Sequence, residues 1–479
     1  TSLKHGLRPE KVCVIGAGPC GITAAKNLMD ANFSNIVIFE KNNAVGGNWL
    51  YSSDADRHAS VYETTHLVSS KTLSGYADFP LPDHYPDFPS HIQMLEYFQA
   101  YSRHFGVDRL IQFNTLVNHA DKGSDGRWRI TTKKKNHHEI ETQVFDYLVV
   151  CNGHHWNPKL PSYEGSFSGE FLHSHFYSHA APFKGKRVLV IGGGNSACDI
   201  AVETCRIAKT DISIRHGGWY MPKLLFGLPT DVLYGKLQWL PKRLQQFCLE
   251  WAIRLHIGPW DSYGLPQPQG RVYETTSVYN SDLLQSIRHG KMGVRPGIER
   301  LEGRCVHFSD GSVGEYDTII AATGFNIKFP FFDENIVNAD APDFQLAAHM
   351  LPPNHNDLFF IGLCQPSGCV WVISELQSKV MARQMQGKLN LAYRFRTETG
   401  KTHRARDEKF SLHIDYPSYR KLLLKLLGFT RAVQPMPASI TFWHKTRATL
   451  GLLFTPAPKT SVGAGSNLTR DTGLKLTKR

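Results

Sequence analysis

The sequence predicts an α/β fold built on parallel sheets, and three observations support that prediction. The stretch KVCVIGAGPCGITAAKNL begins at Lys11, and KRVLVIGGGNSACDIAVE begins at Lys186. Each reads as a short apolar strand, a glycine-rich turn and a helix. The other strand-like runs are short, β-branched and continuously apolar, which is typical of parallel sheets buried on both faces. Strands and helices also alternate along the chain, as they do in α/β proteins.

The expected elements follow that alternation. Strands are predicted at 12–15, 36–39, 147–151, 188–191, 211–214, 317–322 and 358–361, and helices at 19–30, 92–104, 195–208, 242–255 and 374–388. Residues 112–150 read as a meander that returns to the first sheet. Residues 217–270 are rich in Pro, Gly and Trp, so we expect an inserted lobe there that belongs to neither sheet.

The composition of the 479-residue chain is that of a soluble globular enzyme, with 41% hydrophobic and 20% charged residues. No run of about eighteen apolar residues is present, which argues against a membrane-spanning helix. The opening TSLKHGLRPE lacks the apolar core of a signal peptide. Nine scattered cysteines without a C-x-x-C pair favour a reducing, cytoplasmic location and no metal site.

The net charge of +12 suits an enzyme that binds anionic cofactors. The basic residues are dispersed and no recognition module is visible, so no nucleic-acid partner is expected. The tail is different, because SYRKLLLKLLGFTR and the following residues mix Lys421, Lys425 and Arg431 with Leu and Phe. We favour a tail that packs on the protein body, and the alternative is peripheral contact with an anionic membrane surface.

The first glycine turn is a complete G-x-G-x-x-G. Its residues are Gly16, Ala17, Gly18, Pro19, Cys20 and Gly21. The glycines permit the tight turn, the close approach of a pyrophosphate and the packing of helix on strand. The helix N-terminus then offers N–H groups to the phosphates. The next strand ends in Glu40, followed by Lys41, and this acid is placed to accept hydrogen bonds from a ribose.

A second glycine pair follows this acid. Gly46 and Gly47, with Asn48 and Trp49, form another point of close approach. An acid, a short loop and then Gly-Gly is what FAD sites add to the dinucleotide motif. We therefore expect FAD rather than NAD at the first turn.

The second glycine turn differs from the first in the residues that follow it. Its members are Gly192, Gly194, Asn195, Ser196 and Ala197, with Ala as an accepted variant of the third glycine. The next strand ends in Arg215 and His216 instead of an acid, and a cation there suits the 2′-phosphate of NADPH. Lys223 is a further candidate. Two Rossmann-like domains, one for each cofactor, therefore predict hydride transfer from NADPH to FAD.

Several motifs resemble those of the flavin-containing monooxygenases. FSGEFLHSHFY, with Phe167, Gly169, His173 and Tyr177, matches the F-x-G-x-x-x-H-x-x-x-Y fingerprint of that family. ADFPLPDHYPDF (77–88), CNGHH (151–155), ATGF (322–325) and ISELQ (373–377) are also similar to it. The resemblance covers roughly residues 10–390.

The resemblance implies a class B flavoprotein monooxygenase. Its FAD domain (1–162 and 318–445) would be split by an inserted NADPH domain (163–317), with a basic tail at 446–479. NADPH would reduce FAD, and O2 would then add to form a C4a-(hydro)peroxyflavin. That species would oxygenate a nitrogen or sulfur atom of a small molecule, while the protein positions the two rings and excludes water.

The resemblance also implies roles for residues outside the glycine turns. It places His66, Ser69, Lys71 and His173 at the reaction site, with His66 and Val68 near the cofactors and further cofactor contacts from Val117, Thr323 and Gln365. The family has Asn where YETTHLVSSK places Val68, and Val cannot donate a hydrogen bond. His66, Ser69 or Ser70 would have to supply a substitute donor, and a poorly shielded site would release H2O2.

Other functions stay open from the sequence. A disulfide reductase shares the double-nucleotide fold, but its cysteine pair lies beside the flavin. Here the C-x-x-x-x-C spacing of Cys364 and Cys369 comes late, so we interpret both as packing residues. A Baeyer–Villiger oxygenase carries Trp where this chain has Tyr177. A third alternative is a cofactor-binding protein without enzymatic activity.

Overall fold

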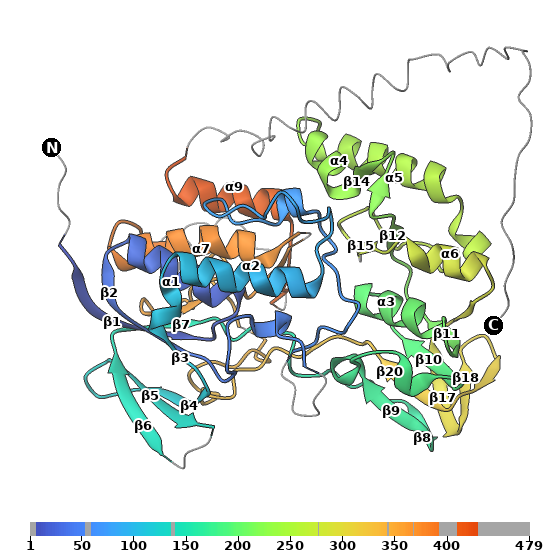
Figure 1. The fold of residues 1–479 in the computed structure, drawn as a ribbon, viewed down its shortest axis with the longest axis horizontal. Helices are drawn as coiled ribbons and strands as arrows, with labels where there is room; N and C mark the ends of the chain where they lie inside the picture. The colour runs from blue at the N-terminus through green and yellow to red at the C-terminus, as the bar shows by residue number, and fades with distance from the viewer. Residues whose placement is uncertain are drawn as a thin grey trace, which may run out of the picture. The chain divides into compact units, whose positions relative to one another are not determined.

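The computed structural model describes residues 6–52, 59–135, 139–275, 277–342, 344–366, 368–391 and 410–429. A five-stranded sheet carries the first glycine turn (Figure 1). Its order is β21 (Leu358–Phe360), β7 (Tyr147–Val150), β1 (Arg8–Ile15), β2 (Phe33–Phe39) and β3 (Ile111–Gln112). All neighbouring strands in it run parallel, and the four strands predicted here at 12–15, 36–39, 147–151 and 358–361 are confirmed.

Three helices share the apolar core of this sheet: α1 (Pro19–Asp30), α2 (His91–His104) and α7 (Val370–Met385). Helix α2 begins at Ser90, which forms a capping box with Gln93. The sequence placed α7 at 374–388, but it starts earlier and ends at Met385. Gly387 follows with a φ of 72°, a left-handed conformation that ends the helix.

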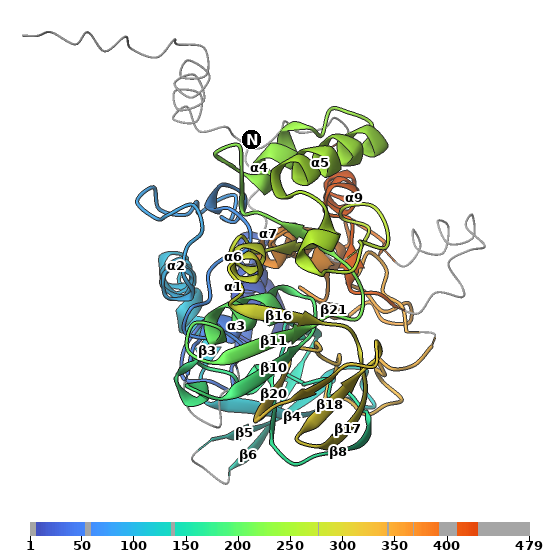
Figure 2. The same cartoon turned by 90° about the vertical axis from the view of Figure 1, so that its right-hand side faces the viewer.

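A second five-stranded parallel sheet carries the second glycine turn (Figure 2). Its order is β16 (Met292–Arg295), β11 (Lys209–Ser213), β10 (Arg187–Ile191), β20 (Thr318–Ala321) and β9 (Glu170–His173). Helices α3 (Asn195–Thr204) and α6 (Asp282–Arg288) accompany it. Helix α3 is shorter than the predicted 195–208, because the chain turns after Thr204 to enter β11.

The strands of the second sheet are inserted in the sequence between two groups of strands of the first. Those of the first sheet come from residues 8–150 and 358–360, and those of the second come from 170–321. Strand β20 pairs with β10 and β9, so the second sheet extends past the boundary predicted after residue 317. The domain boundaries themselves stay predictions.

Two smaller sheets accompany the main ones, of which the first is antiparallel and the second is mixed. The predicted meander at 112–150 is confirmed as β4 (Thr115–Lys122), β5 (Trp128–Lys134) and β6 (Ile140–Phe145), followed by β7 of the first sheet. The sequence did not predict the second arrangement. Its strands are β8 (Glu164–Phe167), β17 (Ile298–Gly303), β18 (Cys305–Phe308) and β19 (Val313–Glu315).

The inserted lobe is confirmed as a part of the chain outside both five-stranded sheets (Figure 1). Its elements are β12 (Trp219–Met221), β13 (Leu224–Leu225), β14 (Leu228–Pro229), α4 (Thr230–Lys236), α5 (Lys242–Ile257) and β15 (Ser277–Tyr279). Because β12 pairs with β15, the lobe extends beyond the predicted end at residue 270. Trp219 and Trp260 lie buried in the core that the lobe shares with α3.

The tail begins with α9 (Tyr416–Leu426), which packs on α7. Tyr419, Leu423 and Leu426 are buried in the core of the first sheet, so the favoured interpretation of this stretch, packing on the protein body, is confirmed. Arg431 and the predicted tail 446–479 lie outside the described residues. Among the helices that are described, we find none with the length and hydropathy needed to cross a membrane.

Candidate FAD and NADPH sites

The first glycine turn joins β1 to α1 and leaves no room for side chains. A Cβ atom on Gly16, whose φ is 101°, would lie 2.7 Å from the carbonyl oxygen of Cys151. A Cβ atom on Gly21 would lie 1.9 Å from the carbonyl oxygen of Gly16. Helix α1 starts at Pro19 with Gly18 as its N-cap, and no side chain caps it. The positive end of the helix is therefore available to an anionic group.

The second glycine pair lies directly against this turn. The amide of Gly46 donates to the carbonyl of Ala17 at 3.2 Å. A Cβ atom on Gly47 would lie 2.8 Å from the Cα atom of Gly18. The side chain of Asn48 accepts a hydrogen bond from the amide of Ser60 at 2.7 Å, and the ring of Trp49 packs edge-on against that of Trp371. The structure thus brings together the residues predicted to hold the FAD pyrophosphate.

Glu40 follows β2 at the same edge of the sheet and is 4% exposed. One carboxylate oxygen accepts from the amide of Ala17 at 2.7 Å, and the other from the amide of Asn42 at 2.8 Å. Each oxygen keeps a lone pair for a ribose hydroxyl. The ammonium group of Lys41 lies over the ring of Trp156, and burial lowers its pKa.

Three predicted cofactor contacts come from other elements. Val117 lies on β4 and is buried in the core between the meander and the first sheet. The hydroxyl of Thr323 donates to the carbonyl of Lys159 at 2.6 Å. Gln365 is exposed, and its backbone N–H donates to the carbonyl of Leu412. This hydrogen bond of Thr323 joins the loop after β20, which contains Thr323, to the loop that contains Lys159.

The stretch with the predicted reaction-site residues is held by its own polar contacts. His66 is exposed, and its Nδ1 lies 2.8 Å from the carbonyl oxygen of Thr64. Val68 is half-buried. The Ser69 hydroxyl is buried, 3.0 Å from the Ser74 hydroxyl and 2.9 Å from the sulfur of Cys369. Ser69 therefore has its partners within the protein.

Lys71 lies two residues beyond Ser69. Its ammonium group donates to the carbonyls of Asp83 and Tyr85. These contacts close the loop between residues 71 and 85, so the structure shows a loop-closing part for this side chain.

The second glycine turn repeats the construction of the first. A Cβ atom on Gly192, whose φ is 134°, would lie 2.5 Å from the carbonyl oxygen of Ala322. Gly194 is the N-cap of α3 without a capping side chain, and a Cβ atom there would meet nothing within 4 Å. Asn195, Ser196 and the buried Ala197 form the first turn of α3, and the Asn195 side chain accepts from the amide of Tyr279.

The candidate 2′-phosphate ligands follow β11. Arg215 and His216 are exposed at the end of the strand, on the side of the sheet that carries the second turn. Lys223, the further candidate, is engaged elsewhere, because its ammonium group donates to the carbonyl of Leu67 at 3.1 Å. Arg215 and His216 are therefore the better placed pair.

His173 connects the family fingerprint to the stretch ATGF. It is 1% exposed, its Nε2 lies 3.0 Å from the carbonyl oxygen of Gly324, and its Nδ1 accepts from the amide of His175 at 3.1 Å. These contacts require a neutral ring with the proton on Nε2, and burial lowers its pKa. With both nitrogens engaged, His173 is suited to fixing the connection between the sheets.

His154 follows β7 at the edge that carries the first glycine turn. It is 8% exposed, and neither ring nitrogen has a hydrogen-bond partner. Burial lowers its pKa from 6.5 to about 3. Apart from its place in the stretch CNGHH, no pattern in the amino-acid sequence singled out His154.

His154 should make the protein sensitive to acid. Below a pH of about 6.5, His154 binds a proton in the unfolded chain but not in the folded protein. The free energy of unfolding therefore decreases as the pH is lowered, by up to about 1.4 kcal/mol per pH unit. We expect urea unfolding of the His154→Leu variant to depend less on pH between about 4 and 6.5 than that of the wild type. His289→Leu, at an exposed position, is the control and should unfold like the wild type. Equal slopes for all three would contradict this assignment.

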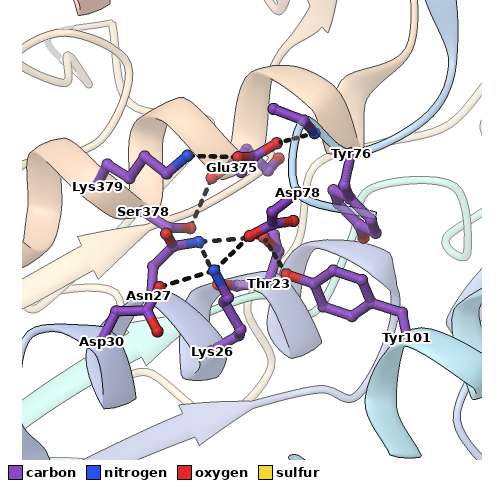
Figure 3. A network of polar contacts seen from close by, with 12 residues as sticks. Thr23, Lys26, Asn27, Asp30, Tyr76, Asp78, Tyr101, Glu375, Ser378 and Lys379 are labelled. Carbon is purple, nitrogen blue, oxygen red and sulfur yellow. Dashed lines mark hydrogen bonds and ion pairs between the residues drawn. The ribbon is translucent and has the colours of Figure 1, made fainter. Parts of the chain in front are cut away.

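A polar network anchors α1 to the stretch that follows Lys71 (Figure 3). The Tyr76 hydroxyl donates to the carbonyl of Pro19 at 2.7 Å. The ammonium group of Lys26 pairs with Asp78 and, at 2.7 Å, with Asp30. The amide of Ala77 donates to Glu375 on α7 at 2.8 Å. The sequence analysis did not predict the pairing of Asp78 with α1.

The two cysteines considered for a disulfide reductase are packing residues. Cys364 and Cys369 are free, buried and part of the core around α7. Burial raises the pKa of Cys369 to about 12 and also raises the pKa of Cys364. Thiols with such pKa values are poor nucleophiles at neutral pH, so this interpretation is confirmed.

The residues present therefore fit two dinucleotides. Two helices begin at glycine turns, and no side chain caps either N-terminus. A Cβ atom on Gly16, Gly21 or Gly192 would collide with backbone atoms. The first turn has the buried acid and the second Gly-Gly, and the second turn has an exposed arginine. This difference is the one that the sequence analysis associates with FAD at the first turn and NADPH at the second.

Comparisons with known proteins agree with this arrangement. The family model described as flavin-binding monooxygenase-like matches residues 9–417. Dimethylaniline monooxygenase (N-oxide-forming) 2 of Oryctolagus cuniculus is 34% identical over 401 residues, which are 80% of this chain and 74% of that protein. The structure of S-allyl-L-cysteine S-oxygenase from Allium sativum aligns with a TM-score of 0.67 at 23% identity, over 93% of both chains. OTEMO in complex with FAD and NADP aligns at 0.65 and 18%, over 88% of this chain and 99% of that one.

Proposed function

The chain belongs to the flavin-binding monooxygenase-like family, and from that membership we propose the reaction and the residues that support it. The protein is an FAD- and NADPH-dependent monooxygenase, which uses O2 to oxygenate nitrogen or sulfur nucleophiles in small molecules. The observation that carries the residue assignments is the contrast between the two glycine turns, one followed by the buried Glu40 and the other by the exposed Arg215.

FAD is held by the first turn. The backbone of Gly16–Gly21 and the start of α1 would bind the pyrophosphate, and Gly47, which packs against Gly18, would border the same site. Glu40 accepts hydrogen bonds from the ribose, and its two backbone donors keep the carboxylate oriented. The flavin supplies the redox and oxygen-transfer chemistry, so the protein needs few acid–base groups of its own.

NADPH is held by the second turn. The start of α3 after Gly194 receives the pyrophosphate, and Arg215 with His216 receives the 2′-phosphate. His173 holds the chain at Gly324, where it leaves β20 of the second sheet.

The chain's own residues must also exclude water from the reacting atoms. Ser69 turns inward to Ser74 and Cys369, and Val68 contributes an apolar surface. Since Val68 offers no donor at the position where the family has Asn, a second outcome is favoured at this site: part of the NADPH is spent on H2O2.

Purified protein with FAD, NADPH and O2 tests this function. We expect a yellow protein that converts a thioether to its sulfoxide and a tertiary amine to its N-oxide, and that releases measurable H2O2. Conversion of a ketone to an ester instead would assign the Baeyer–Villiger reaction. A protein that stays colourless after incubation with FAD would refute the proposal.

A further inference from the structure

The stretch Ser60–Lys71 is attached to the second half of the molecule, although it belongs in sequence to the first. The Tyr62 hydroxyl donates to Asp199 of α3 at 2.6 Å, and the Thr64 hydroxyl donates to Glu203 of the same helix at 2.7 Å. Asn280 donates to the other oxygen of Asp199. The residues that carry the second cofactor turn therefore also fix the first part of this stretch.

Two charged side chains of the inserted lobe grip the next part. The ammonium group of Lys223, which lies between β12 and β13, donates to the carbonyl of Leu67 at 3.1 Å. A carboxylate oxygen of Asp231, on α4, accepts from the amide of Ser70 at 2.7 Å. The two contacts enclose Val68 and Ser69 from either side.

The side chains of Lys223 and Asp231 are both partly removed from water, which disfavours their charged forms. Burial lowers the pKa of Lys223, and the nearby Asp199 and Asp282 oppose that change. Burial also raises the pKa of Asp231, against hydrogen bonds from the backbone of Ser70 and Val232. Lys223 further lies over the ring of Phe88. Charges in such surroundings persist only where they are well paired, so these contacts are specific and not incidental.

We propose that Lys223 and Asp231 are positioning residues for the oxygenation reaction, which set the backbone of Leu67–Ser70 and thereby the apolar surface that the proposed function gives to Val68. The inference rests on the proposed function. Val68 has no polar group with which to fix its own place, so its position depends on the backbone at its two ends. Because displacement by about 1 Å can cost on the order of a hundredfold in a reaction step, loosening either end should open the site to water.

Variants at each end of the grip test this role. Asp231→Ala removes the acceptor of the Ser70 amide, whereas Asp231→Asn keeps an acceptor and removes only the charge. Lys223→Met removes the donor to Leu67 and keeps the length of the side chain. Asp261→Ala and Lys291→Met are matched controls, because both residues are exposed and distant in sequence from the grip.

The first measurement is hydrogen–deuterium exchange of the purified protein without added FAD or NADPH. Exchange within residues 67–71 should be at least about tenfold faster in Asp231→Ala, because the Ser70 amide loses its partner. Lys223→Met should show faster exchange in the same peptides, and Asp231→Asn and both controls should match the wild type. Unchanged exchange in both Asp231→Ala and Lys223→Met would overturn the inference.

The second measurement is the H2O2 formed per NADPH consumed, with a thioether present. Asp231→Ala and Lys223→Met should raise this ratio severalfold while FAD content and the rate of flavin reduction by NADPH stay those of the wild type. Faster exchange with an unchanged ratio would overturn the role in oxygenation. Absence of oxygenated product from the wild type would refute the proposed function itself, and this role with it.

Discussion

Gly21→Ala should yield a protein without bound flavin. The added Cβ atom would lie 1.9 Å from the carbonyl oxygen of Gly16 and 3.0 Å from its carbonyl carbon. Both are backbone atoms of the turn itself, so no side chain can move aside. The turn must open, which turns the amides at the start of α1 away from the pyrophosphate. We expect FAD affinity to fall by at least about a hundredfold, a loss of about 2.7 kcal/mol.

Absorbance at the flavin maximum and titration of the apoprotein with FAD measure this effect. Gly6→Ala is the control, because a Cβ atom there meets nothing within 4 Å and the backbone is unrestricted. Circular dichroism shows whether the variant keeps its secondary structure. A folded Gly21→Ala protein that binds FAD as the wild type does would contradict the assignment of the first turn.

The Arg215→Ala substitution should strongly weaken the binding of NADPH and leave the binding of NADH unchanged. Arg215 follows β11 at the place where a ribose lies in such folds, and it is exposed beside Gly297. A guanidinium group makes paired, charge-assisted hydrogen bonds to a phosphate, and NADH lacks the 2′-phosphate that Arg215 would bind. We expect KM for NADPH to rise by about tenfold to a hundredfold, corresponding to about 1.4–2.7 kcal/mol.

Steady-state flavin reduction with each nucleotide measures the preference. Arg206→Ala removes another exposed arginine of the same half, from the turn after α3, and should leave both KM values unchanged. A variant whose preference for NADPH equals that of the wild type would show that the 2′-phosphate binds elsewhere.

Much of the fold could be predicted because its strands carry strong local signals. Val12, Cys13 and Val14 are fully buried in β1, and such continuous apolar runs are readable in any parallel sheet. The glycine turns were equally plain, because Gly16, Gly21 and Gly192 stand where a Cβ atom would collide with the backbone. Strands β8 and β9 were missed, since each has only 4 residues and neither forms a continuous buried apolar run.

The contacts of the inserted lobe were beyond sequence reasoning for a different reason. Lys223 has the charge expected of a phosphate ligand and was interpreted as one, yet its partner is a backbone carbonyl more than 150 positions away. Asp231 has no motif around it, and its partner is a backbone amide. Any residue type supplies such a partner, so neither pairing leaves a trace in the amino-acid pattern.

The position of β21 bears on how the protein is made. A ribosome delivers the strands of the second sheet, 170–321, before it delivers Leu358–Phe360, the edge strand of the first sheet, and before it delivers α7. During translation the first sheet therefore lacks its edge strand β21 until all strands of the second sheet have been synthesised. Nascent chains shorter than about 390 residues are the ones on which a chaperone would have the most exposed apolar surface to shield.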